Sequence, residues 1–335
     1  MGTYTNKRLL VTGGAGFIGS ELVRQLVEDG AHVTVLDNLT AGHRRNLEAL
    51  PADGYRLVVA DIRDLERVDA LMPGIDAVFH LACRGVRHSI HSPVENHGVN
   101  ATGTLGLLKS ARAADVPRFV YVSTSEVYGS APQVPMSEDN LALPTTVYGA
   151  SKLAGECYTR AFHRTYDYPT VVVRPFNSYG PRSHHEGDSG EVIPKFMLRS
   201  MAGLPMVVFG DGSQTRDFTF VADTARGILA AGASDAAVGE TINVGSGKEI
   251  TVAELAATVS KVVGGGDATI EHVEQRPGDV LRLKADVSRA TALLGWAPTV
   301  PLADGLSQLR DWYLQGGSSP EDLLAEEKVR NWELV

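Results

Sequence analysis

The sequence predicts an α/β protein with a doubly wound parallel sheet and a smaller C-terminal α/β lobe. Short apolar runs alternate with amphipathic stretches through the first half of the chain, a pattern typical of parallel strands joined by crossover helices. A glycine-rich turn joins the first apolar run to the first amphipathic stretch. After about residue 176 the alternation gives way to loop-rich segments between the remaining elements, which indicates a second part.

Six apolar runs in the first half are the expected strands of one sheet. They span residues 8–12, 32–36, 56–60, 77–81, 119–122 and 170–173. The helices expected between them include residues 17–28, 93–114 and 147–164. Six strands with intervening helices predict a doubly wound nucleotide-binding sheet.

The second half contains fewer and more widely spaced elements. Helical patterns lie near residues 193–202, 221–231 and 252–262, with a weak one in 321–330, and strand-like runs lie at 240–244 and 268–276. We therefore predict a first domain of residues 1–176 and a smaller lobe of residues 177–335, partly interleaved with the first.

Composition and charge exclude several classes of partner. The chain has 335 residues, of which 43% are hydrophobic, and a formal net charge of −9. Such an acidic chain is a poor general binder of nucleic acid or anionic membranes. It shows neither a signal peptide nor an apolar stretch of membrane-spanning length, and it has two cysteines, Cys83 and Cys157. With only two cysteines, we expect a cytoplasmic protein. We expect no metal, because the histidines and cysteines lack ligand spacing.

The glycine-rich turn reads GGAGFIG and lies between a strand and a helix. Gly13 permits the tight turn, Gly16 lets the backbone approach a pyrophosphate, and Gly19 allows the helix to pack closely on the strand. Phe17 and Ile18 begin the helix, whose N–H groups and partial positive charge favour phosphate. In this context the turn predicts a Rossmann-like fold that binds a dinucleotide.

An acidic residue ends the second expected strand. Asp37, followed by Asn38, is placed to hold a ribose 2′-hydroxyl, and its carboxylate repels a 2′-phosphate. The predicted cofactor is therefore NAD, although the basic run at residues 43–45 leaves NADP open. Later strand ends on the same sheet edge are expected to border the adenine and pyrophosphate, namely Asp61, Ile62, Leu81 and Ala82.

Tyr148 and Lys152 are four residues apart in YGASK and therefore share one face of a helix. A phenol ordinarily ionises near pH 10, and a fixed cation beside it favours the phenolate. We expect Lys152 to lower the pKa of Tyr148 towards neutrality. Beside a dinucleotide site, this gives a base that takes a hydroxyl proton while a hydride leaves the same carbon.

The chain resembles the extended short-chain dehydrogenases/reductases, among them the NAD-dependent epimerases, 4,6-dehydratases and decarboxylases of nucleotide sugars. The resemblance rests on GGAGFIG, HLAC, STSEVYG, YGASK, RPFNSYGPR, GDGSQTRDF and RPGDV, and runs from about residue 7 to residue 312. It implies that Tyr148 is the base, that Lys152 binds the nicotinamide ribose, and that Thr124 bonds the sugar 4-hydroxyl. It also implies hydride transfer from sugar C4 to NAD, which gives a bound 4-keto intermediate.

The residues after Thr124 bear on the chemical step that comes after the oxidation. Ser125 and Glu126 complete a Thr-Ser-Glu trio that resembles those of GDP-mannose 4,6-dehydratases and of dehydratases acting on N-acetylglucosamine nucleotides. A 4-ketone acidifies the hydrogen at C5, and a nearby carboxylate can remove it. We therefore expect a 4,6-dehydratase. In dTDP-glucose 4,6-dehydratases an aspartate stands at the position of Ser125, which argues against that substrate.

Three alternatives remain open. A 4-epimerase acting on UDP-glucose or UDP-glucuronate ranks second, because the segments around Arg216 and Arg276 match the epimerase pattern. A UDP-glucuronate decarboxylase ranks third, since those enzymes have an arginine near the position of Leu283. An NAD-binding redox sensor without turnover ranks last, because such proteins usually lose the tyrosine or the lysine.

The resemblance also implies a substrate site in the smaller lobe. Arginines suit diphosphate because their planar fork forms paired charged hydrogen bonds. The residues expected at the nucleotide sugar are Arg87, Asn177, Val192, Arg216, Arg276 and Asp279. UDP is the preferred nucleotide, with dTDP or GDP possible, and a homodimer through the helices at 93–114 and 147–164 is the family's usual assembly.

Overall fold

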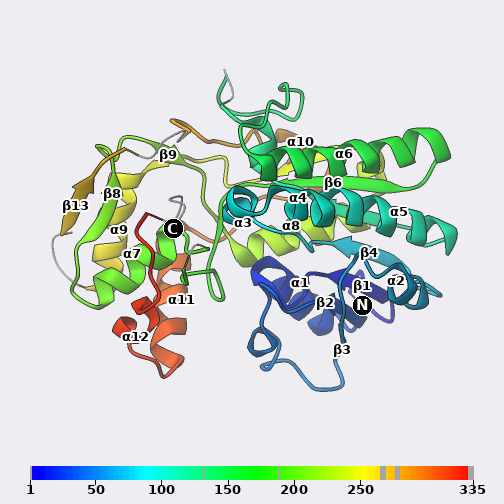
Figure 1. The fold of residues 1–335 in the computed structure, drawn as a ribbon, viewed down its shortest axis with the longest axis horizontal. Coiled ribbons are helices and arrows are strands. Elements are labelled where there is room, and N and C mark those ends of the chain that lie inside the picture. The colour runs from blue at the N-terminus through cyan, green and yellow to red at the C-terminus, as the bar shows by residue number, and fades with distance from the viewer. Residues whose placement is uncertain (1, 131–132, 188, 265–268, 276–279, 331–335) are drawn as a thin grey trace.

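The computed structural model describes residues 2–130, 133–187, 189–264, 269–275 and 280–330. A large sheet with helices on both faces forms one part of the molecule, and a smaller lobe lies beside it (Figure 1). None of the helices in these ranges is long and apolar enough to cross a membrane.

The central sheet has seven strands in the order β11-β6-β5-β4-β1-β2-β3, and all pairs are parallel. The strands are β1 (Arg8–Thr12), β2 (His32–Asp37), β3 (Tyr55–Val59), β4 (Ala77–His80), β5 (Phe119–Val122), β6 (Thr170–Pro175) and β11 (Thr241–Val244). The chain leaves β1 to one side and returns at β4 on the other. The strand order therefore reverses between β1 and β4, where ligands bind in open parallel sheets.

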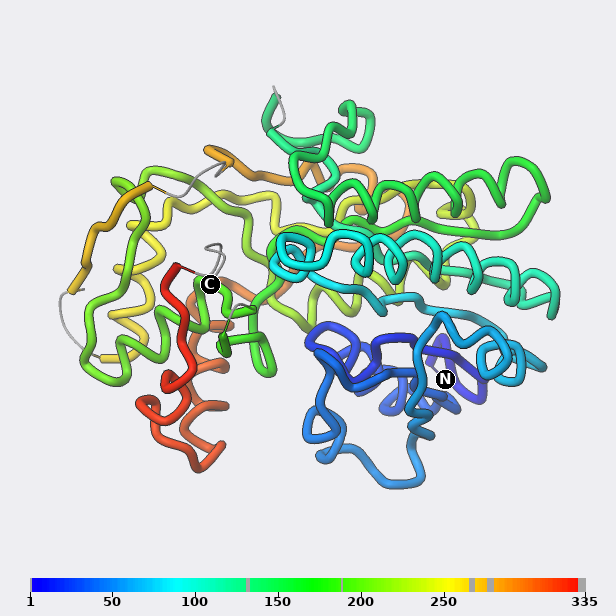
Figure 2. The backbone as a smooth tube through the Cα atoms, viewed as in Figure 1, coloured from blue at the N-terminus to red at the C-terminus, as the bar shows by residue number. Residues whose placement is uncertain are grey.

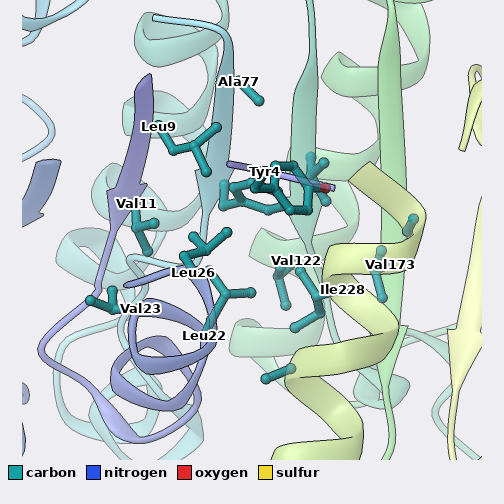
Figure 3. Packing of buried hydrophobic residues seen from close by; sticks show 14 of the residues in the cluster. Tyr4, Leu9, Val11, Leu22, Val23, Leu26, Ala77, Val122, Val173 and Ile228 are labelled. Carbon is teal, nitrogen blue, oxygen red and sulfur yellow. The ribbon is translucent and has the colours of Figure 1, made fainter. Parts of the chain in front are cut away.

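Alternating side chains of β1 pack into two separate hydrophobic cores. Leu9 and Val11 pack into one cluster, whereas Leu10 packs into the other. The first cluster lies under α1 (Phe17–Glu28), α8 (Val221–Ala233) and α10 (Ser288–Leu294), and Figure 3 shows its packing. The second lies under α2 (Leu65–Leu71), α5 (Thr104–Ala113) and α6 (Val147–Tyr166). Both faces of the sheet are therefore buried, as a doubly wound fold requires.

The sheet differs from the six-strand expectation because β11 adds a seventh strand from the second half of the chain. β11 pairs with β6, and α8, which precedes it, packs on the same sheet face as α1. All four residues of β11 are buried, as expected of a strand covered on both sides, although Thr241 and Asn243 are polar.

The single helix expected at residues 93–114 is three segments. They are α4 (Pro93–His97), a π-helical stretch (Gly98–Gly103) and α5. Asn100 lies in the π-helical stretch, where its amide accepts a hydrogen bond from Arg84 N (2.7 Å) and donates one to Arg84 O (2.9 Å). The extra residue in the turn thus aims Asn100 at the loop after β4. Such π-bulges are frequent at functional sites.

The smaller lobe has its own core, which includes Ile193, Phe196, Val208, Leu255 and Leu306. Its helices are α7 (Val192–Met201), α9 (Val252–Val263), α11 (Leu302–Gln315) and α12 (Pro320–Leu324). Its strand pairs are β8 (Met206–Phe209) with β13 (Ile270–Val273), and β9 (Thr215–Arg216) with β12 (Ile250–Thr251). The remaining elements are α3 (Val86–His91), β7 (Ser178–Tyr179), β10 (Thr219–Phe220) and short 3-10 turns at Arg44–Asn46, Ser125–Tyr128 and Asp235–Ala237.

Candidate active site

One cleft of about 1010 Å³ lies at the carboxyl ends of the central strands and extends to the smaller lobe. Every sequence-predicted site residue in the described ranges lines it: Gly13, Gly16, Phe17, Ile18, Gly19, Asp37, Asn38, Asp61, Ile62, Leu81, Ala82, Arg87, Thr124, Ser125, Glu126, Tyr148, Lys152, Asn177, Val192 and Arg216. Arg276 and Asp279 lie outside the described residues.

The glycine turn shapes one end of the cleft. Gly13 has a left-handed backbone (φ 71°), and a Cβ there would lie 2.6 Å from Ala82 N. A Cβ on Gly19 would lie 2.0 Å from Gly13 O, so helix α1 can approach the turn only through glycine. Gly16 precedes α1 without a side-chain cap, so no side chain competes with a ligand for the first N–H groups of the helix. This end of the cleft is therefore suited to bind an anion.

Asp37 lies beside the glycine turn at the end of β2. Its Oδ2 accepts a hydrogen bond from Ala15 N (2.9 Å), and its Oδ1 accepts one from Leu39 N (2.8 Å). A carboxylate has about four acceptor positions, so two backbone bonds fix its orientation and leave capacity for a ribose hydroxyl. A Cβ on Gly42 would lie 2.8 Å from Asp37 Oδ2, so glycine keeps this space open.

Asp61 and Asn38 form a polar patch further along the same edge. Asn38 Nδ2 donates to Asp61 Oδ2 (3.0 Å), and Arg63 donates to both oxygens of Asp61 (2.8 Å each). The hydrogen bonds from Arg63 lower the pKa of Asp61 to about 2. Asp61 is therefore ionised at neutral pH.

Tyr148 lies in the first turn of α6, which begins after Thr146, whose hydroxyl caps Gly149 N (2.9 Å). Its phenol shares side-chain hydrogen bonds with Thr124 and Cys83. Burial raises the pKa of Tyr148 well above its ordinary value, and the charge of Glu126 raises it further, while the bond with Thr124 acts in the opposite direction. The phenol is therefore protonated in the protein alone.

The expected lowering of the Tyr148 pKa by Lys152 is wrong for the protein alone. Lys152 is 1% exposed, donates from Nζ to Val122 O (2.7 Å), and lies over the Tyr121 ring at 4.5 Å from its centroid. Its ammonium is thus directed at β5. Burial also lowers the pKa of Lys152 itself. Sharing a helix face places the two residues in one cleft but does not overcome the burial of the phenol.

Glu126 enters the same cleft from the loop after β5. Its backbone N–H donates to Thr124 Oγ1 (3.2 Å), which starts a short 3-10 turn over Ser125–Tyr128. Glu126 is half-buried and close enough to Tyr148 for its charge to act on the phenol. A hydroxyl, a phenol and a carboxylate therefore meet in one place.

The substrate side of the cleft offers cations and one unsatisfied acceptor. Arg216 Nη1 donates to Thr215 O and Val280 O, both at 2.7 Å, which holds the guanidinium in the cleft wall. Asn177 Oδ1 is buried and has no hydrogen-bond partner in the protein. A buried acceptor of this kind is costly unless a ligand satisfies it.

Some cleft residues were not predicted from the sequence. Cys83 follows β4 in HLAC and contacts the phenol of Tyr148, yet an isolated cysteine gives no sequence signal. Lys195 and Arg199 line the cleft from α7. Their spacing of four residues on one helix was the available signal.

Known proteins share this architecture along nearly the whole chain. The model of the GDP-mannose 4,6-dehydratase family matches residues 10–309. The chain belongs to this family. The resemblance to the extended short-chain dehydrogenases/reductases is thereby confirmed, as is the Rossmann-like fold.

Relatives of this family member include two kinds of nucleotide-sugar enzyme. The chain is 40% identical to a dTDP-glucose 4,6-dehydratase of Streptomyces niveus, covering 91% of this chain and 92% of the relative. It is 38% identical to a UDP-glucose 4-epimerase of Mycolicibacterium smegmatis, covering 91% and 98%. The structure of DesIV, a dTDP-glucose 4,6-dehydratase of Streptomyces venezuelae with NAD bound, matches with a TM-score of 0.86 at 37% identity, covering 92% and 97%.

Proposed function

We propose that this protein is an NAD-dependent enzyme that oxidises C4 of a nucleotide-diphosphate hexose and then removes water across C5 and C6. The observation that carries the proposal is the position of Glu126, which comes two residues after Thr124 and lines the same cleft as Tyr148. Family membership supports the nucleotide-sugar substrate and the cofactor.

The residues at the glycine turn fit NAD. The first turn of α1 would hold the pyrophosphate, Asp37 would hold the adenine ribose, and Lys152 would bind the nicotinamide ribose. Any Cβ on Gly13 or Gly19 would fill the space next to the turn. When bound, NAD would supply a positively charged ring and would accept the hydride of sugar C4.

Tyr148 removes the proton of the sugar 4-hydroxyl. Its pKa is raised by burial in the protein alone, so the phenolate forms only when additional positive charge lies near it. Thr124 bonds the phenol in a way that lowers its pKa, and it also orients the substrate hydroxyl. Tyr148 is half-buried and lines the cleft.

Glu126 then acts on the ketone. The 4-keto group acidifies the C5 hydrogen, Glu126 takes that proton and delivers it to the C6 hydroxyl, and this group leaves as water. The hydride removed from C4 ends on C6, and a proton from solvent ends on C5. The product is a 4-keto-6-deoxy sugar, and the overall change is the loss of one water.

The test is turnover in heavy water with UDP-, dTDP- and GDP-hexoses, analysed by mass spectrometry and NMR. A 4-keto-6-deoxy product with deuterium at C5 is expected. The Glu126→Gln variant should still oxidise C4, seen as reduced NAD in the protein, but should form the product far more slowly. Retention of the original C5 hydrogen in every product molecule would rule out the dehydration.

A 4-epimerase is the second candidate, favoured by the relationship to a UDP-glucose 4-epimerase and by Arg216 in the cleft wall. It would interconvert gluco and galacto sugars without solvent label at C5. The decarboxylase is disfavoured, because Leu283 is 4% exposed in an apolar cluster where those enzymes carry an arginine.

UDP is the proposed nucleotide, on the basis of Arg216 and Arg276, of which Arg276 lies outside the described residues. The proposed assembly is a homodimer through the helical segments from α4 to α5 and through α6, where Val94 (85% exposed), Val147 (44%) and Tyr166 (49%) are exposed apolar side chains. Sedimentation of the purified chain tests the dimer, and a monomer at all concentrations would contradict it. Cys83 and Cys157 are free thiols, which supports a cytoplasmic location.

A further inference from the structure

The chain continues past the matched family region into a segment that returns to the cleft. The family model ends at residue 309, whereas α12 begins at Pro320. After α12 the chain runs back past α7 (red in Figure 2). Glu327 and Val329 line the cleft together with Val192 and Arg216. We call residues 327–329 the C-terminal strap.

Helix α7 holds the strap with two cations one turn apart. Arg199 Nε donates to Glu327 Oε1 (3.1 Å) and Oε2 (3.0 Å), and the two side chains are 14% and 10% exposed. Lys195 Nζ donates to Lys328 O (2.6 Å). A largely buried ion pair with two hydrogen bonds fixes geometry better than an exposed pair does.

A loop between β7 and α7 supports the strap from the other side. Gly187 N donates to Glu326 O (3.0 Å), and Gly187 and Glu327 form a parallel bridge. The same loop is tied to the sheet domain, because Arg182 bonds Glu21 of α1 (2.6 Å). The strap therefore packs against a loop that is itself bonded to the sheet domain.

We propose that the C-terminal strap is a wall of the nucleotide subsite and determines which base is accepted. This inference rests on the proposed function and on the expectation from the sequence that Val192, at the start of α7, lies at the nucleotide sugar. Arg199 neutralises the carboxylate of Glu327, which would otherwise repel a diphosphate in the same cleft. Val329 adds an apolar side chain to that wall, suited to a flat base.

Two variants test the strap. One chain ends after Ala325, which removes the strap but keeps α12, and the other is Glu327→Ala in the full chain. The matched control is Glu326→Ala, because the Glu326 side chain is exposed and only its backbone oxygen contacts the loop. Calorimetry measures UDP, dTDP and GDP binding to the NAD-loaded protein, and steady-state kinetics separate KM from kcat.

For both strap variants we expect nucleotide Kd and KM to rise at least about tenfold, with kcat within about threefold of the parent. In the shortened chain the Kd values for UDP, dTDP and GDP should also differ less from one another than in the parent. Unchanged Kd and base preference, or a loss confined to kcat, would overturn the strap's role. If the shortened chain fails to fold, Glu327→Ala against Glu326→Ala decides. If the unmodified protein binds no nucleoside diphosphate and turns over no nucleotide sugar, the proposed function itself fails.

Discussion

Replacing Glu156 by glutamine should destabilise the helix that carries the proposed base. Glu156 is fully buried two turns after Tyr148 on α6. Its Oε1 accepts Arg174 Nε (2.9 Å), and its Oε2 accepts both Arg174 Nη2 (2.6 Å) and Arg160 Nη1 (2.8 Å). An amide turns one of these acceptors into a donor, so at least one guanidinium N–H loses its partner in either orientation.

The burial of the pair sets the magnitude. The Arg174 side chain is 4% exposed, and removing the partner of a buried charge costs about 3–5 kcal/mol. That is a large fraction of the roughly 5–15 kcal/mol that stabilises a typical domain. The control is Glu28→Gln, because Glu28 forms the same kind of ion pair with Arg24 but its side chain is 61% exposed. This substitution should cost at most about 0.5 kcal/mol.

Urea unfolding followed by circular dichroism measures the free energy of unfolding of both variants. Repeating the measurement at lower pH gives a second test. Burial raises the pKa of Glu156, but the hydrogen bonds and charge of Arg174 outweigh burial and hold the pKa below its ordinary value. The carboxylate therefore stabilises the fold above about pH 4.3 and loses that contribution as the pH falls through its lower native pKa. The gap between wild type and Glu156→Gln should shrink in acid. A gap below about 1 kcal/mol at neutral pH would refute this reasoning.

Three further substitutions test the site. Gly19→Ala should weaken NAD binding at least about tenfold by calorimetry, because the new Cβ would lie 2.0 Å from Gly13 O, whereas a Cβ on Gly98 meets nothing within 4 Å and Gly98→Ala should bind normally. Equal loss in both would contradict the role of the turn. Glu126→Gln should slow dehydration by about 10²–10⁴-fold in a product assay, and an unchanged rate would remove Glu126 as the base. Thr124→Val should move the rising limb of kcat/KM to higher pH, because the lost hydrogen bond lowers the pKa of Tyr148; an unmoved limb would contradict that contact.

Local signals predicted the elements that build the cofactor side. The helix expected at residues 17–28 is α1 with the same bounds, since glycine precedes it and its apolar spacing is regular. The helix at 93–114 is interrupted because the π-helical stretch is set by contacts of Asn100 with a distant loop, which periodicity does not contain. β11 joins the central sheet through pairing with β6, a contact that the sequence order does not reveal.

The site shows the same division between local and long-range information. Motif order placed Tyr148 and Thr124 in one cleft, because parallel strands end at one edge. The pKa of Tyr148 depends instead on burial and on Cys83. Lys152 donates a hydrogen bond to Val122 O and lies over the Tyr121 ring. The Arg199–Glu327 pair joins residues far apart in the chain, so only the folded structure brings them together.

The central claim is that Tyr148 starts catalysis by taking the proton of the sugar 4-hydroxyl. Steady-state turnover of the Tyr148→Phe variant with NAD and the preferred nucleotide sugar tests it most directly, with NAD and nucleotide binding measured on the same sample. Turnover at least about a hundredfold below wild type, with both affinities within about twofold, is the predicted result. Wild-type turnover without the phenol oxygen would contradict the claim.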